Sequence, residues 1–223
     1  MTEAERYSRQ VLCWGQERQR ALEGATVLVA GVGGLGATVS QLLARAGVGR
    51  LILVDDGVAA WPDLNRQTLY GEKDVGKKKV LVAREKLAAI NSAIEIVTLD
   101  TRIDREFTVP PGVSAVADCL DNFAGRFALH RATPAGVPFV HGGIQGDHGQ
   151  VLTLIPGESQ SLEALFAGCR QPEGPIPVTP HGPLIIAGLM ANELFHLLQG
   201  EPRLRDRMLV VDLATLSLQF LDV

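Results

Sequence analysis

Cysteine is scarce in this 223-residue chain, and no apolar segment is long. The three cysteines, Cys13, Cys119 and Cys169, are too scattered to form the disulfide framework of a small secreted domain. The longest apolar run, residues 183–191, is too short to cross a bilayer. The first residues are charged where a signal peptide has an apolar core. We therefore expect a cytoplasmic protein without a membrane segment.

The chain also lacks a large excess of either charge, because its formal net charge is −4 at pH 7. Nothing in that balance predicts nucleic acid or an anionic membrane as a partner. No internal repeat and no interdomain linker interrupts the sequence, and a hydrophobic content of 46% can supply a substantial core. We therefore expect one domain over residues 1–223.

The stretch that organises the chain begins with a β-branched apolar run at residues 26–30, which is typical of a buried parallel strand. A helical repeat of apolar residues follows and ends at Gly47, and a second strand at 51–54 runs into Asp55 and Asp56. Four glycines separate the first strand from the helix, and they are Gly31, Gly33, Gly34 and Gly36.

Strand, glycine turn, helix, strand and acid form the pattern of a Rossmann unit. Glycines let the backbone approach a phosphate, and the helix N-terminus attracts the anion. The acid stands about 20 residues after the glycines, where such units bind a ribose. The pattern predicts nucleotide binding, and the alternative is a tight turn that only packs a helix on a sheet.

The remaining pattern predicts a Rossmann-like three-layer α/β fold, in which a mainly parallel sheet has antiparallel edge strands. A polar helix is expected near the N-terminus and a long Gly/Pro-rich crossover loop before the last helix. The expected helices cover residues 2–20, 76–91, 123–132 and 183–198, the strands 94–99, 112–118, 138–141, 150–155, 208–212 and 217–222, and the loop 156–182.

Polar residues stand where predicted strands end, which is where open α/β sheets bind ligands. Arg66, in the loop after the second strand, can pair bidentately with a phosphate, although a solvated arginine is an equal alternative. The lysine run 77–79 opens a helix against its dipole, which suggests an anion nearby or simply solvated side chains. In the segment 118–122, one carboxylate can cap the next helix and another can hold Mg²⁺.

The five histidines do not have the spacing of metal ligands. His141 and His148 bracket a glycine-rich stretch that we expect to be a turn, and structural roles are the simpler interpretation for both. Cys169 is alone in the crossover loop, and a lone cysteine without a neighbouring base is expected to be inert.

Several of these segments together resemble the HesA/MoeB/ThiF family, which is similar to the adenylation domain of ubiquitin-activating enzymes. The resemblance covers about residues 5–223, and a plain dehydrogenase has no reason to carry all of its motifs. The motifs are RYSRQ at 6–10, GVGGLG at 31–36, DLNRQT at 63–68, VGKKKV at 75–80, DCLDN at 118–122 and the late G-P-L helix.

The resemblance implies a homodimer that uses ATP and Mg²⁺ to adenylate the C-terminal glycine of a ubiquitin-like sulfur-carrier protein ending in Gly-Gly, with release of pyrophosphate. By the same resemblance, the four glycines would face the nucleotide and Asp55 would hold the ribose. Arg66 and Lys79 would neutralise the triphosphate, Asp121 would coordinate Mg²⁺, and Arg9 would reach the partner subunit's site. The binding set would be completed by Asp56, Asn65, Gln67 and Asn122.

The chain departs from the family pattern at several points. It has no paired Cys-x-x-Cys, so no zinc site is expected. The family cysteine ahead of the late helix has no counterpart near Pro175, which leaves a later sulfur or thioester step without an assigned thiol. Asp63 stands where the family has asparagine, and Gly57 where it has an acid. We therefore expect the reaction to stop at the acyl-adenylate.

Two other functions stay open at this point. One is a catalytically degenerate scaffold that binds a carrier, which Asp63 and the missing cysteines favour. The other is an NAD-linked Rossmann oxidoreductase, which would bind NAD(H) in preference to ATP. The sequence does not choose among thiamine, molybdopterin, cysteine or other sulfur pathways.

Overall fold

The computed structural model describes residues 3–171 and 173–223. Thr2 of the expected N-terminal helix and Pro172 of the expected loop lie outside the described residues. The strands are β1 (Thr26–Ala30), β2 (Arg50–Val54), β3 (Glu95–Leu99), β4 (Ala115–Asp118), β5 (Phe139–Gln145), β6 (His148–Leu154), β7 (Arg207–Asp212) and β8 (Ser217–Asp222). The α-helices are α1 (Glu3–Arg6), α2 (Ser8–Glu23), α3 (Gly36–Ala46), α4 (Lys79–Ile90), α5 (Phe123–Ala132), α6 (Leu162–Leu165) and α7 (His181–Leu198), with short 3₁₀-helices η1 (Trp61–Asp63) and η2 (Glu72–Asp74).

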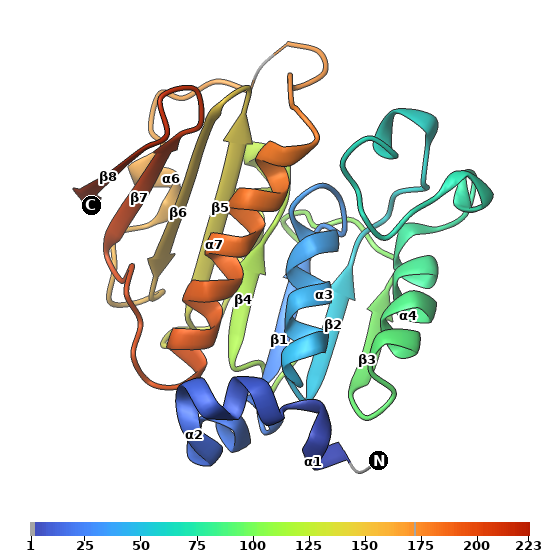
Figure 1. Cartoon of the computed structure of the whole chain (residues 1–223). Helices are drawn as coiled ribbons and strands as arrows, with labels where there is room; N and C mark the ends of the chain where they lie inside the picture. The colour runs from blue at the N-terminus through green and yellow to red at the C-terminus, as the bar shows by residue number, and fades with distance from the viewer. Residues whose placement is uncertain (1–2, 172) are drawn as a thin grey trace.

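The strands form one twisted sheet in the order β3-β2-β1-β4-β5-β6-β7-β8 (Figure 1). The first five strands in this order, β3, β2, β1, β4 and β5, are parallel to one another. Strands β6, β7 and β8 are each antiparallel to the strand before them. The predicted fold, a mainly parallel sheet with antiparallel strands at one edge, is confirmed. The chain leaves β1 toward β2 and β3 and then crosses back to β4, so β1 and β4 lie at the topological switch point.

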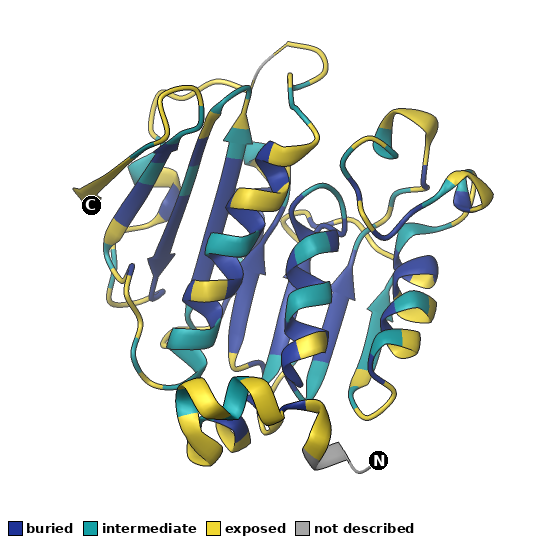
Figure 2. Cartoon of the chain, in the orientation of Figure 1, coloured by how far each residue is buried: buried dark blue, intermediate teal, exposed yellow. Residues whose placement is uncertain are grey.

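The two faces of the sheet bury different residues. Val27 and Val29 of β1 belong to the core under α3, α4 and α7, whereas Leu28 and Ala30 belong to the core under α5 and α6. This alternation is the period of two expected for a strand covered on both faces. Figure 2 shows the central strands buried and the outer helix faces exposed. Burying one leucine side chain such as Leu28 contributes about 2 kcal/mol.

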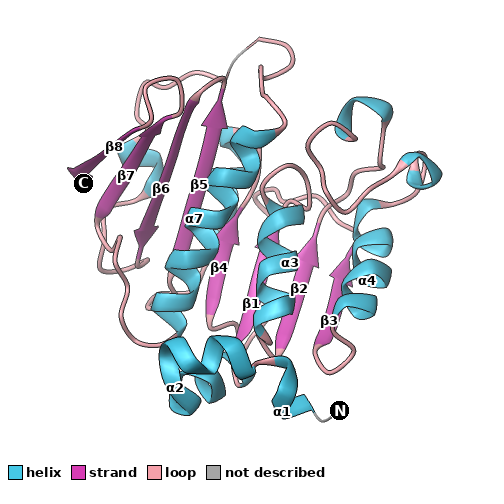
Figure 3. Cartoon of the chain, viewed as in Figure 1, coloured by secondary structure: helices cyan, strands magenta, loops and turns pink. Residues whose placement is uncertain are grey.

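The carboxyl ends of the central strands stop at the same level. Ala30 is in register with Val54 of β2 and with Asp118 of β4. The loops that follow these strands therefore gather at one end of the sheet, and Figure 3 shows long loops there. The glycine turn, Asp55 and the segment 118–122 are brought together by this register.

Several predicted boundaries are wrong. The expected single helix at 2–20 is two helices that meet near Tyr7, and α2 has a kink at Gly15, whose φ of 81° is left-handed. Helix α7 begins at His181, two residues earlier than predicted, because a proline such as Pro183 is tolerated in the first turn of a helix. The crossover loop is therefore shorter than 156–182, and it contains helix α6.

Two other local predictions are also wrong. Gly142 and Gly143 are strand residues of β5 rather than a turn, and the turn to β6 lies at Gly146 and Asp147. Of the three lysines at 77–79, only Lys79 lies inside α4.

A buried carboxylate anchors the end of α7. Glu193 is 1% exposed and accepts hydrogen bonds from the hydroxyl of Thr153 and from the backbone amides of Arg203 and Leu204, at 2.9–3.1 Å. It thereby ties the chain segment before β7 to the sheet. Few acidic residues are buried this completely unless hydrogen bonds compensate them.

We expect Glu193→Ala to lower the free energy of unfolding by about 3 kcal/mol, because three donors, two of them buried, lose their acceptor. Urea unfolding followed by circular dichroism measures this change. The control is Glu158→Ala, which removes an exposed pair with Arg205 and should cost no more than about 1 kcal/mol. Equal losses in both variants would contradict the anchoring role.

Candidate active site

A cleft of about 1290 Å³ opens at the carboxyl ends of β1, β2 and β4. The predicted site residues that line it are Gly31, Gly33, Gly34, Asp55, Asp56, Arg66, Gln67, Lys79, Asp121 and Asn122. Gly36, Asn65 and Arg9 do not line it. The crossover loop also contributes to the wall through residues 174–176 and Val178.

The glycine turn is shaped by close packing. Gly31 has a φ of 82°, and a Cβ there would lie 2.9 Å from the carbonyl oxygen of Cys119. A Cβ on Gly36 would lie 1.8 Å from the carbonyl oxygen of Gly31. Gly36 therefore packs closely under the turn and does not line the cleft, and its expected contact with the nucleotide stays a prediction.

Two amides of this turn are free to bind an anion. Within the described residues, the backbone N–H groups of Gly33 and Gly34 have no hydrogen-bond acceptor, and both residues line the cleft just before α3. Free amides at the start of a helix, together with the positive end of the helix dipole, form a ready phosphate-binding site.

Asp55 links the turn to the neighbouring strand. Its carboxylate accepts hydrogen bonds from the amides of Val32 and Gly57, each at 2.7 Å. Each carboxylate oxygen keeps a second acceptor position. Asp55 can therefore hold the turn and also accept a hydroxyl group from a ligand in the cleft.

Two cations of the cleft, Arg66 and Lys79, share one carboxylate. Asp63 Oδ2 lies 3.2 Å from Lys79 Nζ, and Asp63 Oδ1 lies 3.9 Å from Arg66 Nη2. Arg66 also donates to the side chain of Asn65 at 2.9 Å, so Asn65 supports Arg66 from outside the cleft. Gln67 donates to Asp63 at 2.7 Å. Lys79, Arg66 and Asp63 together form a positively charged group beside the glycine turn.

The segment after β4 provides a cap and a free carboxylate. The side chain of Asn122 accepts from the amide of Gly125 at 2.8 Å, so the cap of α5 is an amide and not the expected carboxylate. Asp121 is exposed in the cleft wall and accepts from Asn122 at 3.2 Å.

Asp121 suits a magnesium ion that is coordinated mainly by substrate phosphates and water and by only one protein carboxylate. In residues 3–171 and 173–223, no group of three or more histidine, cysteine or acidic residues is arranged to hold a metal. Mg²⁺ commonly keeps several waters and binds through one or two carboxylates plus substrate phosphates. Asp121 can supply such a carboxylate, with phosphates on the glycine turn supplying further oxygens.

A buried polar cluster beneath the cleft was not predicted. Arg126 of α5 lines the cleft, lies 3.2 Å from Asp118, and donates to the carbonyl of Gly142 at 2.7 Å. His141 Nδ1 lies 2.7 Å from Asp118, and Gln150 approaches His141 Nε2. The sequence singled out Asp118 within DCLDN and also His141, but it gave no sign that Arg126 joins them.

The charges of this cluster are set by burial and by each other. Burial would raise the pKa of Asp118, but Arg126 and the hydrogen bond with His141 outweigh it and hold that pKa below its usual value. Burial, followed by the charge of Arg126, lowers the pKa of His141 and so favours its neutral form. Its Nδ1 lies 2.7 Å from Asp118 and 2.8 Å from Arg126 Nη1. The cluster joins β4, α5 and β5 under the cleft.

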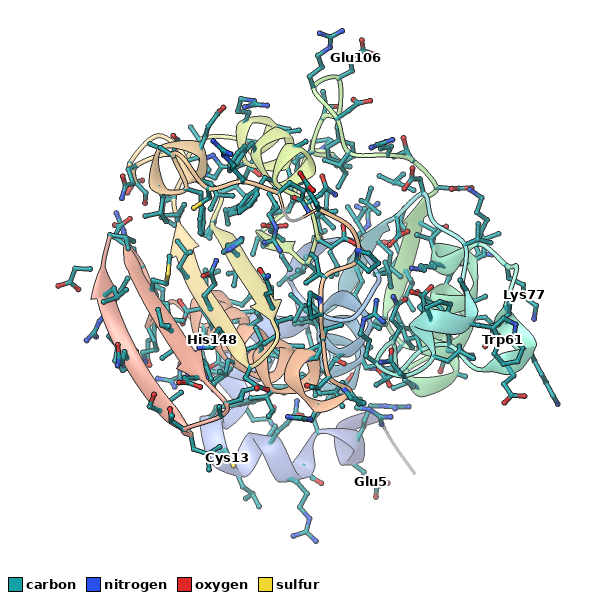
Figure 4. The ribbon with its side chains drawn as sticks, turned by 90° about the horizontal axis from the view of Figure 1, so that it is seen from above. Glu5, Cys13, Trp61, Lys77, Glu106 and His148 are labelled. Atoms are coloured by element: carbon teal, nitrogen blue, oxygen red, sulfur yellow. The ribbon has the colours of Figure 1, made fainter. Side chains whose placement is uncertain are left out.

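Arg9 lies far from this cleft within one chain. It is an exposed residue of α2, and α2 covers the end of the sheet opposite the carboxyl ends of the strands (Figure 1). Figure 4 views the carboxyl ends from above, with Cys13 of α2 on one side and Glu106 of the cleft-lining segment 101–106 projecting on the other.

None of the cysteines is built as a nucleophile in the cleft. Cys169 is exposed and does not line the cleft, and Cys13 is exposed on α2. Cys119 lines the cleft, but burial raises the pKa of its thiol, which disfavours the reactive thiolate.

Among the described helices, none has the length and apolarity to cross a membrane.

Comparison with known proteins gives two relatives in sequence. The heterocyst protein HesA of Trichormus variabilis is 41% identical over 170 residues, which are 74% of this chain and 64% of HesA. The sulfur carrier protein ThiS adenylyltransferase of Bacillus subtilis is 34% identical over 168 residues, which are 72% of this chain and 50% of that protein. The chain thus spans half to two thirds of the length of these relatives.

A solved structure supports the fold. Escherichia coli MccB with ATP superposes with a TM-score of 0.83 at 22% identity, covering 97% of this chain and 71% of MccB. At this identity the likeness concerns the fold alone. The ThiF family matches residues 7–223, which is nearly the whole chain. The chain therefore belongs to the ThiF family.

Proposed function

We propose that this protein is an adenylyltransferase that uses ATP to activate the C-terminal glycine of a ubiquitin-like sulfur-carrier protein. The observation that carries the proposal is the cleft in which the amides of Gly33 and Gly34, the cations Arg66 and Lys79, and the carboxylate of Asp121 surround one space. The name of the Bacillus subtilis relative, a sulfur carrier protein adenylyltransferase, supports the same reaction.

In this reaction the carrier carboxylate attacks the α-phosphorus of ATP. A bond forms between the carboxylate oxygen and phosphorus, and the bond to the β-phosphate oxygen breaks with release of pyrophosphate. The carboxylate is already ionised at neutral pH, so no general base is needed. Because two anions must meet, Arg66 and Lys79 would screen the phosphates and the charge that develops in the transition state.

The other residues of the cleft would orient the nucleotide. Asp55 and Asp56 would face the ribose, and the glycine turn would hold phosphate oxygens. Mg²⁺ on Asp121 would neutralise phosphate charge and aid the departure of pyrophosphate. Loop residues 174–176 and Val178 line the cleft and would cover the extended Gly-Gly tail of the carrier.

The proposal also covers assembly and place of action. We propose that residues 1–223 act as one adenylation domain in a cytoplasmic homodimer, in which Arg9 enters the partner's cleft. The position of Arg9 at the end of the sheet opposite its own cleft supports a role in trans.

A second candidate function is a carrier-binding scaffold without catalysis. The pairing of Asp63 with both Lys79 and Arg66 favours it, because these cations already have a partner. A scaffold would bind a carrier and would catalyse no exchange of pyrophosphate with ATP. The assay in the next paragraph separates the two functions.

We expect Asp121→Ala to reduce carrier-dependent ATP–pyrophosphate exchange at least about 100-fold, because the metal and the phosphates lose a charged ligand. The assay uses a panel of ubiquitin-like carriers ending in Gly-Gly. Circular dichroism checks the fold, and Asp222→Ala, an exposed residue of β8, is the control that should keep native exchange. Native exchange in the Asp121 variant would remove Asp121 from the mechanism.

We expect a mixture of inactive Arg9→Ala and inactive Asp121→Ala chains to recover activity. Random reassortment makes half of the dimers mixed, and each mixed dimer rebuilds one of two sites, so about one quarter of the native exchange should return. Subunit exchange is verified by native mass spectrometry. Demonstrated exchange with no recovery would argue against a site shared between subunits.

We expect purified protein to lack stoichiometric zinc and to accumulate adenylated carrier without a covalent enzyme–carrier adduct. The three cysteines cannot supply four thiolate ligands, and no cysteine is placed as a nucleophile in the cleft. Elemental analysis and intact-mass spectrometry under non-reducing conditions test this. Bound zinc, or a reductant-sensitive adduct on Cys169, would show the prediction to be wrong.

A further inference from the structure

The ion pair of Asp63 and Lys79 lies at the wall of the cleft, where Lys79 is a lining residue, and it is well enclosed. Each of the two side chains is 14% exposed, whereas the neighbouring pair of Lys78 and Asp100 is 41% and 42% exposed. Enclosure strengthens the attraction between opposite charges and equally strengthens repulsion between like charges. The carboxylate of Asp63 therefore acts strongly on any anion that approaches Lys79.

The position of this carboxylate is fixed by hydrogen bonds. Asp63 Oδ2 accepts from the backbone amide of Ala60 at 3.0 Å, and Asp63 Oδ1 accepts from Gln67 Nε2 at 2.7 Å. Arg66 lies on the same side at 3.9 Å. Moving the carboxylate away from Lys79 would break both hydrogen bonds, so the negative charge stays in place when a ligand arrives.

We propose that Asp63 is a built-in counter-ion of Lys79 and Arg66 that makes the cleft select a polyphosphate carrying a divalent metal over the same polyphosphate without metal. This inference rests on the proposed use of ATP. A metal-free polyphosphate meets the fixed carboxylate with its full negative charge. Mg²⁺ cancels part of that charge, so the complex suffers less repulsion and still gains the attraction of the two cations. Selectivity arises here from a repulsive element, as it does in many specific interfaces.

The chain offers a variant that removes the charge and keeps the shape. In Asp63→Asn the new carbonyl can still accept from Ala60. The Oε1 atom of Gln67 is buried and has no hydrogen-bond partner among the described residues. If the Gln67 amide turns, this oxygen can accept from the new amide, so the variant is expected to fold.

The experiment measures ATP binding by isothermal titration calorimetry, once with excess Mg²⁺ and once with EDTA. The ratio of the two dissociation constants is compared among native protein, Asp63→Asn and Asp100→Asn. Asp100→Asn is the matched control, because it removes the carboxylate that pairs with Lys78, the lysine next to Lys79. Asp63→Ser repeats the test with a smaller acceptor, and thermal unfolding checks that each variant is folded.

We expect Asp63→Asn and Asp63→Ser to bind metal-free ATP about tenfold more tightly, because a like charge near the phosphates is gone. Binding with Mg²⁺ should change less, so the ratio falls, and Asp100→Asn should keep the native ratio. A native ratio in folded Asp63 variants would overturn the inference while leaving the proposed function intact. Native protein that binds ATP in neither buffer would overturn both.

Discussion

The contact on which the cleft depends is the one between Gly36 and the carbonyl oxygen of Gly31. No side chain fits between them, since a Cβ on Gly36 would lie 1.8 Å from that oxygen. Helix α3 can therefore start directly below the turn, with its N-terminus aimed at the cleft. Asp55 then ties the turn to β2 through the amide of Val32. Steric fit and one carboxylate thus place the phosphate-binding amides before any ligand arrives.

The charges around this turn are balanced within the protein itself. Lys79 and Arg66 stand at the cleft wall with Asp63 between them, so they are ordered and partly neutralised. An enclosed ion pair costs desolvation free energy and is weak support for stability, but it fixes geometry. Beneath the cleft, Arg126 and Asp118 join α5 to β4 in the same way. Charged groups here position the site more than they stabilise the fold.

Much of the fold could be predicted from local patterns. The β-branched run at β1, the glycine turn and the acid after β2 are each signals carried by a few neighbouring residues, and helix α5 was predicted at its observed bounds. Ten of the predicted site residues line one cleft, because the carboxyl ends of parallel strands meet at one edge. Boundaries near Gly15, Gly146 and His181 were wrong, since they depend on turns and packing that a periodic pattern does not encode.

The sequence by itself determined most of the element types, the ThiF family motifs and ten of the residues that line the cleft. Only the tertiary structure decided which of the predicted residues line the cleft and which other segments complete it. It buried Gly36 under the turn, set Asn65 behind Arg66, and moved Asp63 into contact with Lys79 sixteen positions along the chain. The physical reason is that periodicity and propensity act over a few residues, whereas burial and ion pairing depend on which distant segments the packed sheet brings together.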